Sequence, residues 1–158
     1  MAQLRLIAML ALASCGRGEA APSQLQAPAG WRSAPELAKA ASDAAGSAAT
    51  ATEGWAEPAR GCYAVWLALH GAAASIDAAA DQLLAGVQKL GVTASEIVKP
   101  QPAEHGELAF AFSNQRYRGR MRALLAKTGD VSALACMWNE REPKACEAQC
   151  VQMLGGLR

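Results

Sequence analysis

The bulky apolar side chains of this 158-residue chain are distributed unevenly, and this distribution most constrains how the chain can fold. Leu, Ile, Val, Phe, Trp and Tyr are sparse between residues 16 and 60 and concentrated from Gly61 onward. A segment that cannot bury such side chains cannot offset the conformational entropy lost on folding. We therefore predict a single small domain over residues 61–158, near the lower end of common domain sizes.

The segment before this domain has the composition of a linker. Residues 16–60 are rich in Ala, Ser, Pro, Gly and Thr, as flexible linkers are. Residues 15–60 are therefore predicted to be a low-complexity tether. Residues 36–50 favour an Ala-rich helix that lacks a strong apolar stripe. We expect Trp55 to pack at the edge of the domain and Trp31 to lie in the tether.

The domain itself shows both strand and helix periodicities. The predicted strands are 62–70, 92–98, 108–112 and 131–138, and the predicted helices run from Ser75 to Gly91, from Ser113 to Gly129 and from Pro143 to Gly155. Serine is a good N-cap and glycine a good helix terminator. Right-handed crossovers on a mostly antiparallel sheet then predict an α+β fold, a ferredoxin-like βαββαβ sheet with an extra C-terminal helix over its second face.

The N-terminus carries an export signal. Arg5 is followed by an apolar run over residues 6–13, which is too short for a bilayer span of roughly 20 residues but suits a secretory signal. The next residues, Leu12-Ala13-Ser14-Cys15, closely resemble the lipobox of bacterial lipoproteins. The resemblance implies that the signal peptide 1–14 is removed and that Cys15 carries more than one acyl chain, which anchors a protein stably.

The lipobox also implies a location. The chain would be exported and anchored to the membrane of the bacterial cell envelope through its N-terminal acyl chains. In some bacteria an Asp after the lipidated cysteine retains the protein in the inner membrane, whereas this chain has Gly16. We therefore expect the outer membrane, with the domain facing the periplasm. An ordinary signal peptide followed by an unrelated cysteine is the alternative.

Residues 64–133 also resemble a family of exported bacterial lipoproteins, the one catalogued as domain of unknown function 4349. The resemblance is carried by a strand at Leu108, a helix that ends at Gly129 and a further strand from Val131. Residues 113–115 read Ser-Asn-Gln, where the family often starts the helix with proline. The activity of that family is unassigned, so the resemblance implies no catalytic residue and no cofactor.

Four cysteines besides Cys15 lie in the predicted domain: Cys62, Cys136, Cys146 and Cys150. An even number in a small exported domain indicates two disulfide bonds. The C-x9-C-x3-C spacing is a poor match to zinc sites, although a metal site and buried free thiols remain alternatives. We expect the last helix to cover Trp66 and Trp138. Strands rise about 3.3 Å and helices about 1.5 Å per residue, and these values give the height of each cysteine along the sheet. The predicted bonds are Cys62–Cys146 and Cys136–Cys150.

Two histidines are weak candidates for a metal site. His70 ends the first predicted strand, and His105 lies between Glu104 and Glu107 at the second hairpin. In the predicted topology these positions lie at the same end of the sheet, and imidazole and carboxylate groups are metal ligands. No single element carries a metal-binding spacing, so we predict solvated loop residues, no metal and no cofactor.

Basic residues crowd the predicted second helix, with no acidic residue between Asn114 and Lys127. They are Arg116, Arg118, Arg120, Arg122 and Lys127. Such a face suits the phosphates of lipid or lipopolysaccharide, or an acidic envelope protein, and a solvated face is the alternative. A formal net charge of +1 and export both argue against nucleic acid.

These features together favour a non-enzymatic envelope lipoprotein whose domain binds a partner or stabilises an assembly. The alternative is a periplasmic module that senses a small molecule or ion, by analogy of fold. An enzyme is the third choice, because the chain has no nucleophile elbow, paired-carboxylate motif, phosphate-binding glycine loop or HExxH motif. A deep polar-lined cavity would favour sensing or catalysis, and a flat basic surface would favour a partner.

Overall fold

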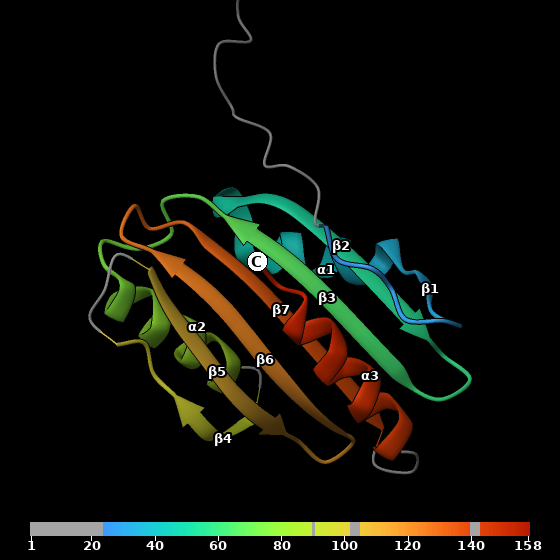
Figure 1. The fold of residues 1–158 in the computed structure, drawn as a ribbon. Helices are drawn as coiled ribbons and strands as arrows, with labels where there is room; N and C mark the ends of the chain where they lie inside the picture. Colours follow the sequence, from blue (N-terminus) through green and yellow to red (C-terminus); the bar gives the residue numbers. More distant parts are fainter. Residues whose placement is uncertain (1–23, 90, 102–104, 140–142) are drawn as a thin grey trace, which may run out of the picture.

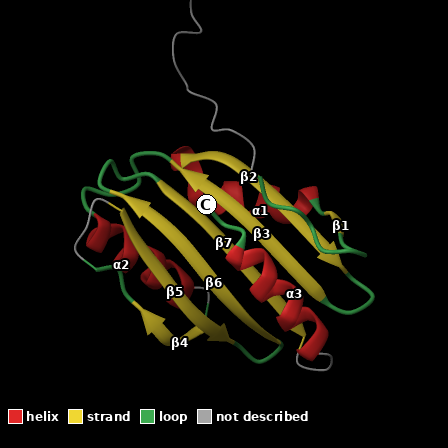
Figure 2. Ribbon diagram, viewed as in Figure 1, coloured by secondary structure: helices red, strands yellow, loops and turns green. Residues whose placement is uncertain are grey.

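One sheet and three helices make up the described chain (Figures 1 and 2). The computed structural model describes residues 24–89, 91–101, 105–139 and 143–158. The strands are β1 (Arg32–Ser33), β2 (Ala49–Glu57), β3 (Cys62–Leu69), β4 (Thr93–Val98), β5 (His105–Ser113), β6 (Tyr117–Ala126) and β7 (Val131–Asn139). The helices are α1 (Pro35–Ala45), α2 (Ile76–Lys89) and α3 (Pro143–Gly155), with a 3-10 turn η1 (Gly46–Ala48). The predicted α+β class is confirmed.

The sheet has seven strands in the order β1-β2-β3-β7-β6-β5-β4, and every neighbouring pair is antiparallel. Figure 1 shows α1 and α2 together on one face of the sheet and α3 on the other. We call these the α2 face and the α3 face. The simple ferredoxin-like βαββαβ arrangement predicted from the sequence is not present.

Several predicted elements are confirmed, because their local patterns agree with their packing. Along β3 alternate residues are buried, and Cys62, Ala64 and Trp66 point into the core of the α3 face. The hydroxyl of Ser75 accepts a hydrogen bond of 3.1 Å from the Ala78 amide and so caps α2. The start of β3 pairs with the end of β7, where Cys62 lies opposite Trp138.

The described part of the predicted tether is not a tether. Residues 32–57 contain β1, α1 and β2, and β2 pairs along its length with β3. Trp31 and Trp55, at 9% and 8% exposed, belong to the core of the α3 face. The indole N–H of Trp31 also donates a hydrogen bond of 2.9 Å to Gln149 on α3. Edge-strand pairing supplies backbone hydrogen bonds that composition does not reveal.

Small residues let α1 pack without a large apolar stripe. A Cβ atom added to Gly54 on β2 would lie 2.5 Å from the Ala34 carbonyl oxygen, closer than such atoms approach. Glycine at this position therefore allows the start of α1 to lie directly on the backbone of β2. None of the α1 side chains is fully buried, so the helix is held by this close approach.

The predicted second helix is wrong, because Tyr117–Ala126 is strand β6. Asn114 makes the turn that precedes it, since its side-chain oxygen accepts the amides of Arg116 and Tyr117 at 2.9 and 2.8 Å. This local bonding favours a turn over a helix start. β5 and β6 then form a hairpin in which Ser113 pairs with Arg118. Met121 and Leu125 recur at helical spacing, but they also share one face of a strand.

The two faces of the sheet have separate cores. The α2-face core is aliphatic and aromatic: Ile76, Ala79, Ala80, Leu84, Leu108, Phe110, Ala123, Leu125, Val131 and Ala133. The α3-face core contains all four tryptophans of the chain and four cysteines: Trp31, Trp55, Trp66, Trp138, Cys62, Cys136, Cys146 and Cys150. The predicted cover of Trp66 and Trp138 by the last helix is confirmed.

Candidate functional site

The α3 face carries a cavity of about 690 Å³ at the end of the sheet beyond the C-terminus of α3. Five strands contribute to it: the start of β2, the ends of β3 and β6 and the starts of β5 and β7. Its lining consists of Thr50, Ala68, Leu69, His70, His105, Gly106, Glu107, Leu124, Leu125, Ala126, Asp130, Val131, Ser132 and Arg158. We call it the sheet-end cavity.

The hollow arises because small residues form its floor where no helix covers them. Ala68, Ser132 and Leu124 are successive cross-strand neighbours on the α3 face. The hydroxyl of Ser132 accepts the indole N–H of Trp66 at 3.0 Å, which holds the floor against the core. Six of the fourteen lining residues are aliphatic and seven are polar or charged, so the cavity combines apolar surface with hydrogen-bonding groups, as small-molecule sites do.

A histidine and an aspartate form a fixed pair on the rim of the cavity. His70 Nδ1 lies 2.6 Å from Asp130 Oδ1, just beyond the paired residues Leu69 and Val131. Asp130 also accepts hydrogen bonds from the Thr128 hydroxyl, at 2.8 Å, and from the Gly71 amide, at 3.3 Å. With its Nδ1 at Asp130, the His70 ring has Nε2 left for another partner.

These hydrogen bonds keep Asp130 ionised. The Thr128 hydroxyl is the largest cause that lowers the pKa of Asp130, and His70 and the Gly71 amide add to it against a smaller effect of burial. The sequence pattern pointed to His70 but not to Asp130. The short turn before β7 was a usable signal for Asp130. Strands β3 and β7 are antiparallel with Leu69 opposite Val131, so the next residues outward, His70 and Asp130, lie side by side.

The other wall of the cavity contains Glu107, which is held in place by an arginine that does not itself line the cavity. Arg122 on β6 donates to both carboxylate oxygens of Glu107, from Nε at 2.9 Å and from Nη2 at 3.0 Å. Its Nη1 donates to the carbonyl oxygens of Leu154 and Leu157, at 2.8 and 3.1 Å. Arg122 thus ties the C-terminal end of α3, where carbonyl groups lack helical partners, to the sheet. The hydrogen bond from Arg122 lowers the pKa of Glu107 and raises that of the arginine.

The predicted placement of the two histidines at one end of the sheet is correct, since His70 and His105 line the same cavity. Glu107 lines it as well, whereas Glu104 lies outside the described residues. Among the described residues no group of three or more His, Cys, Asp or Glu side chains is arranged to hold a metal ion. The arrangement is a rim of hydrogen-bonding groups around an apolar floor.

The predicted basic surface has a different form from the one expected. Arg116 lies in a turn, and the next three arginines of the set lie on strand β6. Arg120 contacts Glu96 at 3.2 Å and Glu147 on α3 at 3.4 Å. Arg122 is used within the fold as described above, and Arg118 and Lys127 also have partners. The five residues therefore do not form one free helix face.

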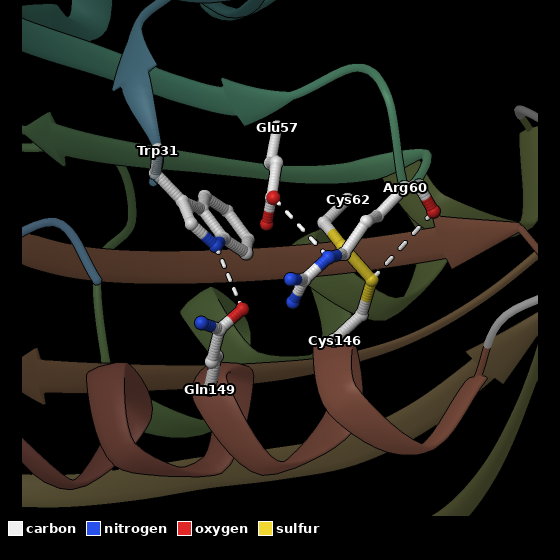
Figure 3. The surroundings of a disulfide bond; sticks show 6 residues. All are labelled: Trp31, Glu57, Arg60, Cys62, Cys146 and Gln149. Atoms are coloured by element: carbon white, nitrogen blue, oxygen red, sulfur yellow. Dashed lines mark hydrogen bonds and ion pairs between the residues drawn. A yellow bond between two sulfur atoms is a disulfide. The ribbon is translucent and has the colours of Figure 1, made fainter. Parts of the chain in front are cut away.

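The cysteines divide into one bond and one pair of thiols. Cys62 on β3 and Cys146 on α3 form a disulfide bond with a Cα–Cα distance of 5.6 Å, the pairing expected from the sequence (Figure 3). Cys136 and Cys150 are free and buried, which differs from the second predicted bond. The Cys136 thiol lies 3.9 Å from the Cys150 carbonyl oxygen. Contact with Cys150 and burial raise the pKa of Cys136, so the thiol stays protonated.

The disulfide belongs to a larger attachment of α3 to the sheet. Figure 3 shows Cys146 and Gln149 on the same helix. Cys146 is bonded to Cys62, and Gln149 accepts the hydrogen bond from Trp31. Arg60, in the turn between β2 and β3, pairs with Glu57 at 3.2 Å. One end of α3 is thus fixed by the disulfide and the other by Arg122. The sheet-end cavity lies beyond the C-terminal end of α3, the end that Arg122 holds.

Cys15, the predicted lipid site, lies outside the described residues. Within the described ranges, none of the helices is both long enough and apolar enough to span a bilayer. No protein-family model matches the chain, and no curated protein matches it. The strand–helix–strand pattern that gave the resemblance to domain of unknown function 4349 is also absent, because residues 117–126 form a strand.

Proposed function

We propose that this chain is a non-enzymatic lipoprotein of the bacterial cell envelope whose domain binds a small molecule in the sheet-end cavity. The observation that supports this most is the cavity itself. Its volume of about 690 Å³ lies within the range typical of small-molecule sites, roughly 300–1,000 Å³. An aliphatic floor with a few convergent polar groups is the usual composition of such a site.

Rigid positioning of the rim supports a binding role further. Asp130 receives three hydrogen bonds, and Glu107 receives two from one guanidinium group. Groups held in this way lose little conformational entropy when a ligand binds. The rim is therefore organised before any ligand arrives.

The structure removes the main reason for a flat anionic-partner surface. That expectation depended on a helix with arginines on one face, whereas Arg120 and Arg122 are engaged with glutamates and with α3. The small-molecule alternative takes its place as the leading function.

Lipid anchoring is the second part of the proposal and is supported by Leu12-Ala13-Ser14-Cys15. We expect the mature chain to begin at an acylated Cys15 and to stay with the membrane fraction of the host. Replacement by Cys15→Ser should leave an unacylated precursor. A mass spectrum that shows a mature N-terminus elsewhere, without lipid, would refute this part and leave the binding function standing.

Binding is tested by thermal unfolding of the chain from residue 15 with Cys15→Ser, in the presence of a panel of small molecules. A ligand at about 100 times its Kd adds about 2.7 kcal/mol to the free energy of unfolding, which corresponds to a rise in Tm of several degrees. Ala126→Phe, which fills the cavity from β6, should abolish the rise. Ala85→Phe on the exposed side of α2 is the matched control and should retain it.

The variant can be checked for folding by its circular dichroism spectrum and its Tm without ligand. A second cavity variant, Leu124→Gln, makes the floor polar with little change in volume and should weaken binding as well. If ligands bind but neither cavity variant affects them, the sheet-end cavity is not the site. If no member of a chemically broad panel raises the Tm, the binding function is wrong.

A further inference from the structure

In the sheet-end cavity the carboxylates already have hydrogen-bond partners within the protein, whereas several basic side chains do not. Both carboxylates are occupied by donors of the protein. Glu107 receives the two hydrogen bonds from Arg122, and Asp130 receives those from Thr128, His70 and Gly71. Neither carboxylate therefore needs a ligand to supply a donor or a positive charge.

The donors on the rim are in the opposite state. Arg158 and His105 line the cavity, and neither side chain has a hydrogen bond or ion pair with another described residue. The Nδ1 atom of His70 is engaged by Asp130, which leaves Nε2 as the ring atom that faces a ligand. The unused capacity of the rim is thus that of donors and positive charge.

The floor defines the rest of the ligand. Ala68, Leu124 and Ala126 present aliphatic surface between the rim groups. Burial of hydrocarbon on this surface is favourable, whereas a ligand that is polar throughout would lose water without compensation. A ligand that fits both parts has an apolar body and an acceptor group at one end.

We infer that the sheet-end cavity takes an organic monoanion with an apolar body, of the class of a hydrocarbon-chain carboxylate, with its head group among Arg158, His105 and His70. This inference rests on the proposed function and specifies its ligand. A single charge is favoured because Glu107 and Asp130 stand on the same rim and repel a second negative charge.

The test compares three ligands with the same ten-carbon chain and different head groups. Decanoate, decanamide and decyltrimethylammonium are titrated by calorimetry into the Cys15→Ser chain that starts at residue 15. We expect decanoate to bind at least about 10-fold more tightly than decanamide, because hydrogen bonds to a charged group are stronger than neutral ones. The cation should bind most weakly.

Variants of two rim side chains assign the effect to the rim. Arg158→Gln and His105→Gln should each weaken decanoate binding, by about 10-fold for the arginine, and leave decanamide unaffected. Lys99→Gln is the matched control, because it removes an exposed charge that pairs with Asp81 of α2, outside the cavity. It should leave all three affinities unchanged.

The outcomes separate this inference from the proposed function. Equal or tighter binding of decanamide or the ammonium ligand, still blocked by Ala126→Phe, would overturn the choice of an anion and retain the binding function. Absence of binding by all three ligands would overturn the inference, and the broader panel then decides the function. Vesicles of phosphatidylglycerol distinguish a free acid from a lipid head group: binding to them without binding of decanoate would also overturn the inference.

Discussion

The two faces of the sheet are built by different means. The α2-face core contains alanine, leucine, isoleucine, valine and phenylalanine, and no cysteine or tryptophan. The α3-face core contains the four tryptophans and is held by the Cys62–Cys146 bond. It is also held by polar contacts, from Trp31 to Gln149 and from Arg122 to the last carbonyls of α3.

This difference explains why the cavity lies on one face. On the α2 face, α2 is attached to the sheet mainly by close aliphatic packing. On the α3 face a covalent bond and charge-assisted hydrogen bonds fix the helix at both ends. The part of the sheet beyond the helix therefore does not need to be covered by α3, and His70, His105 and Asp130 lie there.

The largest expected effect concerns the two free thiols of the α3 face. Cys136 and Cys150 are 0% exposed, and the pKa of Cys136 is raised, so alkylation in the native state should be at least about 100-fold slower than in denaturant. Without reductant, unfolding should expose two reactive thiols, apart from position 15. Peptide mapping that finds none, because the two are bonded, would contradict the structure at this site.

The next effect concerns the covalent attachment of α3. Replacement of both bonded cysteines, Cys62→Ala with Cys146→Ala, should lower the free energy of unfolding by about 2–5 kcal/mol, since the bond spans 84 residues. Urea unfolding monitored by tryptophan fluorescence measures this directly. Reductant should destabilise the wild-type chain and leave the double variant unchanged. A loss below about 1 kcal/mol would mean that packing alone holds α3 in place.

Arg122→Met tests the polar attachment at the other end of α3. The change removes hydrogen bonds to Glu107 and to two carbonyl groups, and should cost about 1–3 kcal/mol in the free energy of unfolding. Arg116→Met is the matched control in the exposed turn, with an expected change within about 0.5 kcal/mol. Equal effects of the two changes would show that the arginines act only as surface charges.

The smallest effect is a dependence on acid pH that belongs to the cavity rim. The pKa values of Asp130 and Glu107 are lowered from their ordinary values of 3.8 and 4.5, so each contributes stability above its ordinary pKa. That stability is lost as the pH falls through the lower folded-state pKa. Because both groups are half exposed, about 0.5 kcal/mol or less is expected from each.

Urea midpoints measured from pH 2 to pH 6 test this dependence. The variants Asp130→Asn and Glu107→Gln should each flatten the curve below pH 5, whereas Asp43→Asn on the exposed side of α1 should leave it unchanged. A curve that Asp130→Asn leaves intact would mean that the His70–Asp130 pair is not formed in solution.

Local pattern predicted much of the second half of the chain. The alternation at Cys62, the serine cap before α2 and Pro143 at the start of α3 each specify an element through neighbours in sequence. Heights along those elements were sufficient to pair Cys62 with Cys146. Strand direction placed His70 near His105, because it determines which ends of neighbouring strands meet.

Sequence patterns alone were therefore sufficient to predict the class of fold, most of the elements after residue 61 and one disulfide bond. Three features became evident only in the folded chain: residues 49–57 join the sheet, residues 117–126 form a strand, and Asp130 holds His70. These features depend on hydrogen bonds between strands distant in sequence, which outweigh local preference. Around Gly54 only Trp55 is a large buried side chain, but β3 gives the backbone of the segment a partner, and glycine lets α1 lie against it.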